Sequence, residues 1–267
     1  MVSQALPLVG CKRTPMTSLP RFHCPAALQV GDELELPAAT ARHVQVRRMQ
    51  PDDAITLFNG EGGEFTATIL RMGRSDVAVR VDARTDTTRE LNVHVNLWCG
   101  ITANERMDWL VEKATELGAF SLLPLAAERS VLKLKGERTD KKLAHWQAIA
   151  VAASEQCGRN QVMSILSPLT LAQALQAAKP NQRAQVRWIL SLSDDAKSVG
   201  EAIVEAQSHA QSLPLEMAVL SGPEGGLSPS EEAQALAAGF IPVSLGSRVL
   251  RAETAPVAVL SVLGALI

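Results

Sequence analysis

The hydrophobic pattern of this chain changes near residue 90, and this change constrains the fold more than any other feature. Before it, short runs such as DELEL, AITLF, EFTATIL and DVAVRV alternate or are β-branched, and turn residues separate them. This pattern is typical of half-buried strands. After residue 92, apolar runs alternate with amphipathic stretches of helical period. We therefore expect a small β domain followed by a larger α/β domain.

The first part is expected to form a small β-barrel with one helix. Its strands are predicted at 32–36, 54–58, 64–70 and 76–81, with a helix at 38–49 and a hairpin loop at 59–63. The polar stretch that follows shows no regular spacing of apolar residues, so it is suitable as a linker. The resulting boundaries are a disordered extension at 1–18, the barrel at 19–84, the linker at 85–92 and the α/β domain at 93–267.

The second part is expected to form a mostly parallel sheet with helices on both faces. Its strands are predicted at 93–101, 120–125, 162–166, 186–193, 216–222 and 241–246, and its helices at 102–118, 140–158, 171–178, 198–211, 229–238 and 255–266. In the first of these helices, Thr102 and Glu105 have the spacing of a capping box, and Gly118 follows the last turn. Ligands of such sheets bind in the loops at the carboxyl ends of strands.

Two glycine-containing loops end neighbouring predicted strands. The first, SGPEGG at 221–226, precedes a helix whose start carries a second capping box, Ser228 with Glu231. The second is SLGSRVLR at 244–251. A glycine pair alone most simply turns a chain, and the motifs G-x-G-x-x-G, G-x-x-x-x-G-K-[ST] and G-x-S-x-G are absent. Two such loops in succession favour a shared ligand site, and the carboxylate of Glu224 disfavours a polyphosphate there.

Charge and cysteine content exclude several classes of protein. A net charge of −2 argues against a generally basic nucleic-acid-binding coat, so RNA contacts would need local clusters. The histidines do not cluster and no C-x-x-C pair occurs, which disfavours a metal site or a disulfide framework and favours a reducing cytoplasm. No apolar run has the length needed to cross a membrane.

The two loops also carry a family resemblance. SGPEGGLSPSE followed by LGSRVLRAETA resembles the paired signature of SPOUT-class RNA methyltransferases, and most closely the RsmE family, which methylates uridine N3 in small-subunit ribosomal RNA. PRFH (20–23), EKATELG (112–118), ERSV (128–131) and SEQCGR (154–159) resemble further motifs of that family, in order. The resemblance implies S-adenosylmethionine as cofactor, a deep trefoil knot at about 188–267, a PUA-like barrel and a homodimer. It also implies that the partner is the small (30S) ribosomal subunit and that its 16S RNA is methylated in the decoding region. No membrane contact and no metal ion are expected.

On this resemblance, the cofactor would lie between the loops, with adenine between leucines and with glycines leaving room for it. The expected cofactor-binding residues are Leu192, Ser193, Ser221, Gly222, Glu224, Gly225, Gly226, Leu245, Gly246, Leu250 and Thr254. Uridine N3 must lose a proton, so positive side chains would stabilise the developing anion. The candidate catalytic residues are Arg251 first, then Arg159 and Arg129, with Glu155 and Glu253 as possible bases or as partners that orient an arginine.

RNA capture requires phosphate contacts, and two clusters offer them. The candidates are Arg42, Arg47 and Arg48 in the barrel, and Arg129, Lys133, Lys135, Arg138, Lys141 and Lys142 in the middle of the chain. Each cluster can also be a solvated charged face, but the second is favoured for RNA because its six positive groups outnumber the acidic residues Glu128, Glu137 and Asp140. The stretch 133–140 has little apolar period and is predicted to be a mobile loop that orders on RNA.

Two other functions remain open from sequence. One is a different SPOUT activity, ribose 2′-O-methylation of tRNA or ribosomal RNA, because the cofactor loops would look alike. The other is a non-catalytic RNA-binding protein with a vestigial knot, which the presence of both loops disfavours.

Overall fold

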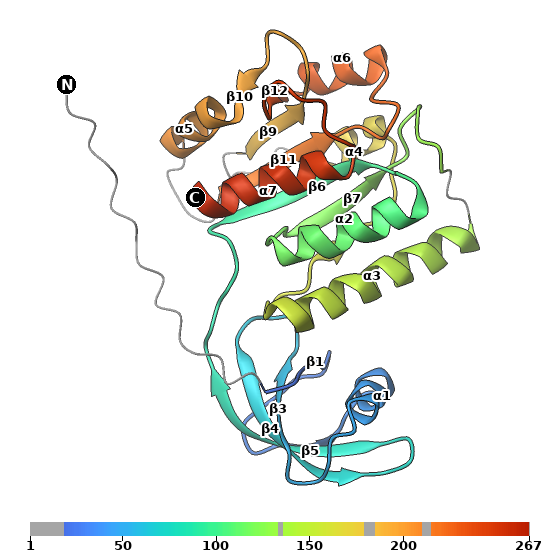
Figure 1. The fold of residues 1–267 in the computed structure, drawn as a ribbon, viewed down its shortest axis with the longest axis vertical. Helices are drawn as coiled ribbons and strands as arrows, with labels where there is room; N and C mark the ends of the chain where they lie inside the picture. The colour runs from blue at the N-terminus through green and yellow to red at the C-terminus, as the bar shows by residue number, and fades with distance from the viewer. Residues whose placement is uncertain (1–18, 133–135, 179–184, 210–214, 267) are drawn as a thin grey trace, which may run out of the picture.

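The computed structural model describes residues 19–132, 136–178, 185–209 and 215–266, which form two domains (Figure 1). The smaller N-terminal domain lies below the larger domain in this view, and a single chain segment rises from one to the other. The expected fold class, a small β domain followed by an α/β domain, is confirmed, whereas the exact domain boundaries stay predictions. The predicted extension at 1–18 lies outside the described residues.

The smaller domain is a five-stranded sheet with one helix, as expected of the first pattern. Its elements are β1 (Arg21–His23), β2 (Glu33–Glu35), α1 (Ala38–Val46), β3 (Ala54–Phe58), β4 (Glu64–Met72) and β5 (Val77–Thr85). The strand order is β1-β3-β4-β5-β2, and every pair is antiparallel except β1 with β3. Alternate residues of β4, Phe65, Ala67 and Ile69, are buried in its core. The short strand β1 was not predicted.

The larger domain is built on a seven-stranded sheet in which every strand pair is parallel. Its strands are β6 (Val93–Gly100), β7 (Ser121–Leu125), β8 (Ser164–Ile165), β9 (Gln185–Leu190), β10 (Lys197–Ser198), β11 (Leu215–Ser221) and β12 (Ile241–Ser244). Its helices are α2 (Asn104–Glu116), α3 (Glu137–Cys157), α4 (Leu171–Ala177), α5 (Val199–His209), α6 (Pro229–Ala237) and α7 (Thr254–Leu266).

Helices cover both faces of this sheet, because the central strands are apolar on both sides. In β11, Met217 and Val219 pack into a core with α2, α3, α5 and α7, whereas Ala218 and Leu220 pack toward α4 and α6. Figure 1 shows α7 and α2 side by side on the first face. Within the described residues, no helix is both long and apolar enough to cross a membrane.

The strand order places the candidate loops together. The sheet runs β10-β12-β9-β11-β6-β7-β8, so β9 lies between β11 and β12 although it precedes both in the chain. The connection from β11 to β12 therefore steps over β9. Because all three strands are parallel, the loops that follow them meet at one edge of the sheet.

Three local expectations require correction. Thr102 and Glu105 do not form a capping box, because α2 begins only at Asn104 and the side chain of Ala103 at its N-cap accepts no hydrogen bond. The stretch 137–140, predicted as loop, is the first turn of α3. The two-residue strand β10 was not predicted. The capping box of Ser228 with Glu231 is confirmed.

Candidate functional site

A cavity of about 480 Å³ opens at the carboxyl edge of the larger sheet. Its walls are the residues after β9, the glycine loop (221–227) after β11, and the C-terminal loop (245–253) after β12. This volume is within the range of cavities that bind small organic molecules. The two loops that were selected from sequence thus form one site.

Most of the predicted cofactor-binding residues line this cavity. They are Leu192, Ser221, Gly222, Glu224, Gly226, Leu245, Gly246 and Leu250. Ser193 does not, since it is exposed and its amide donates to the Ser191 hydroxyl. Thr254 does not either, because it is the first residue of α7 and donates its amide to the Arg251 carbonyl. A cofactor contact of these two residues stays a prediction.

The glycines serve different purposes. Gly246 has a φ of +106° and Gly226 a φ of +70°, so an L side chain at either position would strain the backbone. The Gly226 amide donates to the Pro223 carbonyl and closes a tight turn at 2.8 Å. Gly225 faces away from the cavity, since a Cβ there would lie 3.1 Å from Arg129 Cβ. Its predicted role of making room for the cofactor is therefore wrong.

Apolar side chains are uncovered at the mouth of the cavity. Leu192 is 63% exposed and Val249 is 78% exposed, and both are lining residues. With Leu245 and Leu250 they offer apolar surface to a planar ring. Exposed apolar groups beside polar ones are typical of a binding site.

The charges of the cavity fall into two groups. Arg248 and Arg251 line it, and neither forms an ion pair or side-chain hydrogen bond with another described residue. Glu224 also lines it, but its Oε1 accepts from the Ala103 amide at 3.0 Å and from Arg106 Nη1 at 3.2 Å. Oε1 of Glu224 therefore contacts the start of α2 instead of the ligand contact that was predicted for this side chain. Arg251 remains available to a bound molecule.

Arg129 supports the glycine loop from outside. Its Nη1 donates to the carbonyls of Gly225 and Leu227, each at 3.2 Å. It does not line the cavity, and the contacts that the structure gives its Nη1 hold the loop, so its catalytic role stays a prediction.

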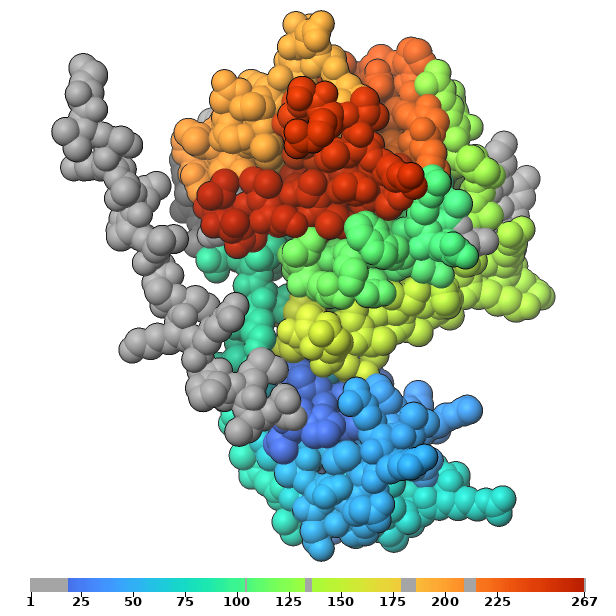
Figure 2. Space-filling model, in the orientation of Figure 1, coloured from blue at the N-terminus to red at the C-terminus, as the bar shows by residue number. Residues whose placement is uncertain are grey.

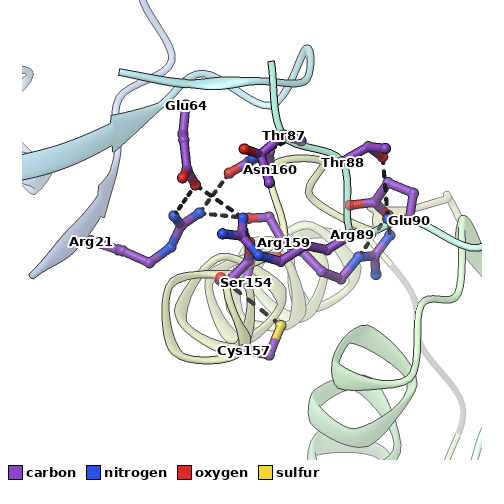
Figure 3. A network of polar contacts seen from close by, with 11 residues as sticks. Arg21, Glu64, Thr87, Thr88, Arg89, Glu90, Ser154, Cys157, Arg159 and Asn160 are labelled. Atoms are coloured by element: carbon purple, nitrogen blue, oxygen red, sulfur yellow. Dashed lines mark hydrogen bonds and ion pairs between the residues drawn. The ribbon is translucent and has the colours of Figure 1, made fainter. Parts of the chain in front are cut away.

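Arg159 lies at the domain interface, defined here as the contact of the barrel and the linker with the end of α3 (Figure 3). Glu155, near the end of α3, contacts the barrel at the same interface. The Arg159 side chain is 4% exposed and donates to Glu90 Oε2 through Nε at 2.8 Å and Nη2 at 2.5 Å. Its Nη1 donates to the carbonyls of Thr115 and Ala119 at the end of α2. Glu155 accepts from the His23 amide at 2.8 Å and lies 3.1 Å from His43 Nδ1. These contacts favour a structural role for both residues, and neither lines the cavity.

The same interface contains a second group of charges. Glu64 of β4 accepts from Arg21 at 2.6 Å and from Arg89 at 3.0 Å (Figure 3). Arg21 also donates to Asn160 Oδ1 at 2.6 Å, which joins the barrel to the segment after α3. Burial raises the pKa of Glu64, but hydrogen bonds and positive charge from the two arginines outweigh it and the net pKa is lowered.

The RNA-binding candidates lie on two separate surfaces. Arg42, Arg47 and Arg48 are exposed on and after α1, whereas Arg138 and Lys141 are exposed and Lys142 is half-buried in the first turns of α3. In Figure 1, α3 begins on the right of the larger domain, the side toward which the strands of its sheet run. The helix α1 of the smaller domain lies below α3 on the same side. Lys133 and Lys135 lie outside the described residues.

Sequence reasoning missed several lining residues. Arg106 enters from the first turn of α2, Val249 lies within the C-terminal loop, and Glu232 lies in α6 after the glycine loop. Arg106 follows the carboxyl end of β6, a strand adjacent to β11. The rule that ligands meet the loops after parallel strands, applied to β6 as well, would have found it.

Cysteine and metal chemistry have no support at this site. Burial raises the pKa of the Cys99 thiol to about 12, so the thiol is protonated and unreactive at neutral pH. In the described ranges, no group of three His, Cys, Asp or Glu residues is placed to hold a metal ion.

Two family models match the chain. The model described as RNA methyltransferase domain matches residues 89–264, and the model described as RNA methyltransferase PUA domain matches residues 36–82. They coincide with the two domains of the structure.

Individual relatives agree with these models. The chain is 32% identical over 218 residues to "Ribosomal RNA small subunit methyltransferase E" of Bacillus subtilis, covering 82% of this chain and 84% of the relative. Among solved structures, a Legionella pneumophila protein in complex with the cofactor SAM is similar with a TM-score of 0.82 and 36% identity, over 92% of this chain and 96% of that one. Ribosomal RNA small subunit methyltransferase E of Neisseria gonorrhoeae, bound to S-adenosyl methionine, is similar with a TM-score of 0.80 and 32% identity, over 91% and 96%.

Proposed function

The chain belongs to the ribosomal RNA small subunit methyltransferase E family, and from that premise we propose that it methylates N3 of one uridine in the 16S RNA of the small ribosomal subunit. The proposal includes the assembled 30S subunit as substrate and the decoding region as the place of modification. That Arg251 lines the cavity without an ion-pair partner among the described residues is the observation that carries the chemistry.

The cavity fits S-adenosylmethionine, whose methyl group on a positive sulfur is the chemistry that it supplies when bound. The apolar groups of Leu192, Leu245 and Leu250 suit the adenine ring, and the backbone of Gly222 and Gly246 can come close to it. Two related structures hold this molecule.

Arg251 has the charge that the reaction needs. N3 of uridine carries a proton at neutral pH, so methylation requires that negative charge develop on the uracil ring. A guanidinium that is already in place stabilises this charge without reorganisation in the reaction step. Arg248, also unpaired among the described residues, adds positive potential to the same wall.

RNA would reach the cavity through phosphate contacts. Arg138 and Lys141 are exposed at the start of α3, on the side toward which the strands run (Figure 1), and Arg42, Arg47 and Arg48 offer a second contact on the barrel. A folded ribosomal surface suits recognition by shape, with the target base turned out of its stack. The proposal also includes a homodimer and a knot in the C-terminal part of the chain, both implied by the family resemblance.

The test is methylation of purified small subunits from cells that lack this protein. The wild-type chain with S-adenosylmethionine is expected to produce 3-methyluridine, identified by nucleoside mass spectrometry and mapped in 16S RNA. Free 16S RNA serves as the matched substrate and tests whether assembly is required. Ribose-methylated nucleosides, or no methylation of either substrate, would contradict the proposal.

A further inference from the structure

Arg106 connects the two loops that form the cavity. It lies in the first turn of α2 and lines the cavity. Its Nη1 is 3.2 Å from Oε1 of Glu224 in the glycine loop, and its Nε is 3.9 Å from Oε1 of Glu253 in the C-terminal loop. One guanidinium thus lies between carboxylates from two loops that follow different strands.

The contact with the glycine loop is firm. Glu224 Oε1 accepts both from Arg106 and from the Ala103 amide at the start of α2, where the helix dipole favours a negative charge. Gly100 is held against the same loop, since a Cβ there would lie 2.3 Å from the Pro223 nitrogen. The glycine loop is therefore fixed to the segment that carries Arg106.

The contact with the C-terminal loop is loose. Glu253 is 8% exposed, and its buried Oε2 has no hydrogen-bond partner among the described residues. The 3.9 Å from Arg106 Nε to Oε1 is longer than a hydrogen bond. A buried carboxylate that is poorly paired is unfavourable, so an attraction between Glu253 and the guanidinium of Arg106 stabilises the C-terminal loop in its present place.

We propose that Arg106 is a positioning residue, which holds the glycine loop through Glu224 and attracts the C-terminal loop through Glu253. In this way Arg106 sets the distance between the glycine loop and the C-terminal loop, between which the methyl donor binds. The identity of that ligand rests on the proposed function. Arg106 acts through the loops, and Arg251 remains the residue that faces the reacting base.

Calorimetric titration of the full chain with S-adenosylmethionine tests this role. Arg106→Ala is expected to weaken binding about tenfold, the effect of one charge-assisted hydrogen bond. Arg106→Lys, which keeps a charge but not the planar group, is expected to recover part of the affinity. Arg71→Ala is the matched control, because Arg71 also lies between two carboxylates, Glu35 and Asp76, but in the barrel. It is expected to bind as the wild type does.

A second readout separates positioning from a general loss of structure. Glu253→Gln removes the attraction but keeps the volume, so it is expected to weaken binding and to show less than additive loss when combined with Arg106→Ala. In methylation assays, Arg106→Ala is expected to raise KM for S-adenosylmethionine while kcat is kept.

Three outcomes would overturn the inference, and they are distinguishable. If Arg106→Ala binds S-adenosylmethionine with wild-type affinity, the inference is overturned and the proposed function is not. If that variant does not fold, wild-type affinity in Glu253→Gln overturns the inference instead. A loss of kcat at unchanged KM would show that Arg106 acts on the reacting atoms instead. If the wild-type chain binds no S-adenosylmethionine, the inference falls together with the proposed cofactor.

Discussion

The domain interface and the cavity contain the same kinds of side chain, arginine and glutamate, in opposite environments. At the interface, Arg159 is 4% exposed and its donors have partners at 2.5–3.0 Å. In the cavity, Arg251 is exposed and unpaired among the described residues, and Arg106 has one contact at 3.2 Å and one at 3.9 Å. A paired, buried arginine stabilises the fold, whereas an unpaired one beside a cavity is available to a ligand.

Space-filling contours show the same difference in position. In Figure 2, residues at the end of α3 lie between the two domains, whereas α7 and the neighbouring C-terminal segments form the surface of the larger domain. Arg159 and Asn160 are buried at the interface, whereas the exposed Leu192 and Val249 line the cavity at the edge of the sheet. Substitutions in the two regions should affect different measurements.

The largest effect is expected from Arg159→Ala. Its loss leaves the half-buried Glu90 without its partner and removes the donors to two carbonyls at the end of α2, so the free energy of unfolding should fall by about 3 kcal/mol. Denaturant unfolding measures it, and Arg138→Ala, an exposed arginine of α3, is the control. If Arg159→Ala kept normal stability but lost methyl transfer, Arg159 would be a catalytic residue, and the interface and the cavity would not differ in the way described.

The next effect is expected from Arg251→Ala. Because Arg251 is exposed and unpaired, the free energy of unfolding should change little. Methyl transfer should fall on the order of a hundredfold, the usual effect of removing one group that stabilises charge in the transition state. Single-turnover methylation of small subunits measures this loss. An unchanged rate would show that the cavity has no charge requirement at this position.

The smallest effect is expected from acid. Burial lowers the pKa of His23 below 6.5 although Glu155 raises it, so the neutral form is favoured and stability is lost as pH falls through 6.5. The pKa of Glu64 is lowered below 4.5, so its contribution is present above 4.5 and is lost as pH falls through its folded value.

Melting temperatures measured from above 6.5 to below 4.5 should therefore decline in two steps. His23→Gln should remove the first step and Glu64→Gln the second. A decline that neither variant changes would show that acid acts outside the domain interface.

Local pattern predicted most of the fold. Strand β3 was predicted at its observed bounds, and the capping box at Ser228 was found, because alternation and helix starts depend on nearby residues. The strands β1 and β10 were missed because two or three residues are too few to show an alternation of apolar and polar side chains. Both strands form by pairing with strands that are distant in the chain, β3 and β12. The knot stays a prediction.

The site was predicted in outline only. Glycines that end successive strands identified both loops, since strand-end loops meet at one edge. Sequence ranked Arg251 before Arg159 but kept both as catalytic candidates, because the burial and the partners that distinguish them are set by tertiary contacts. Glu224 caps a helix that begins far earlier in the chain, a contact that local spacing does not contain.

The position of the cavity-forming segments in the chain has a consequence for synthesis. All three loops lie after residue 189, whereas the barrel is complete by residue 85. Chains emerge N-terminus first and domains fold in that order, so a nascent chain holds a finished barrel while its last strands are still unmade. Translation that stops early would therefore leave fragments that contain the barrel but lack the segments that form the cavity.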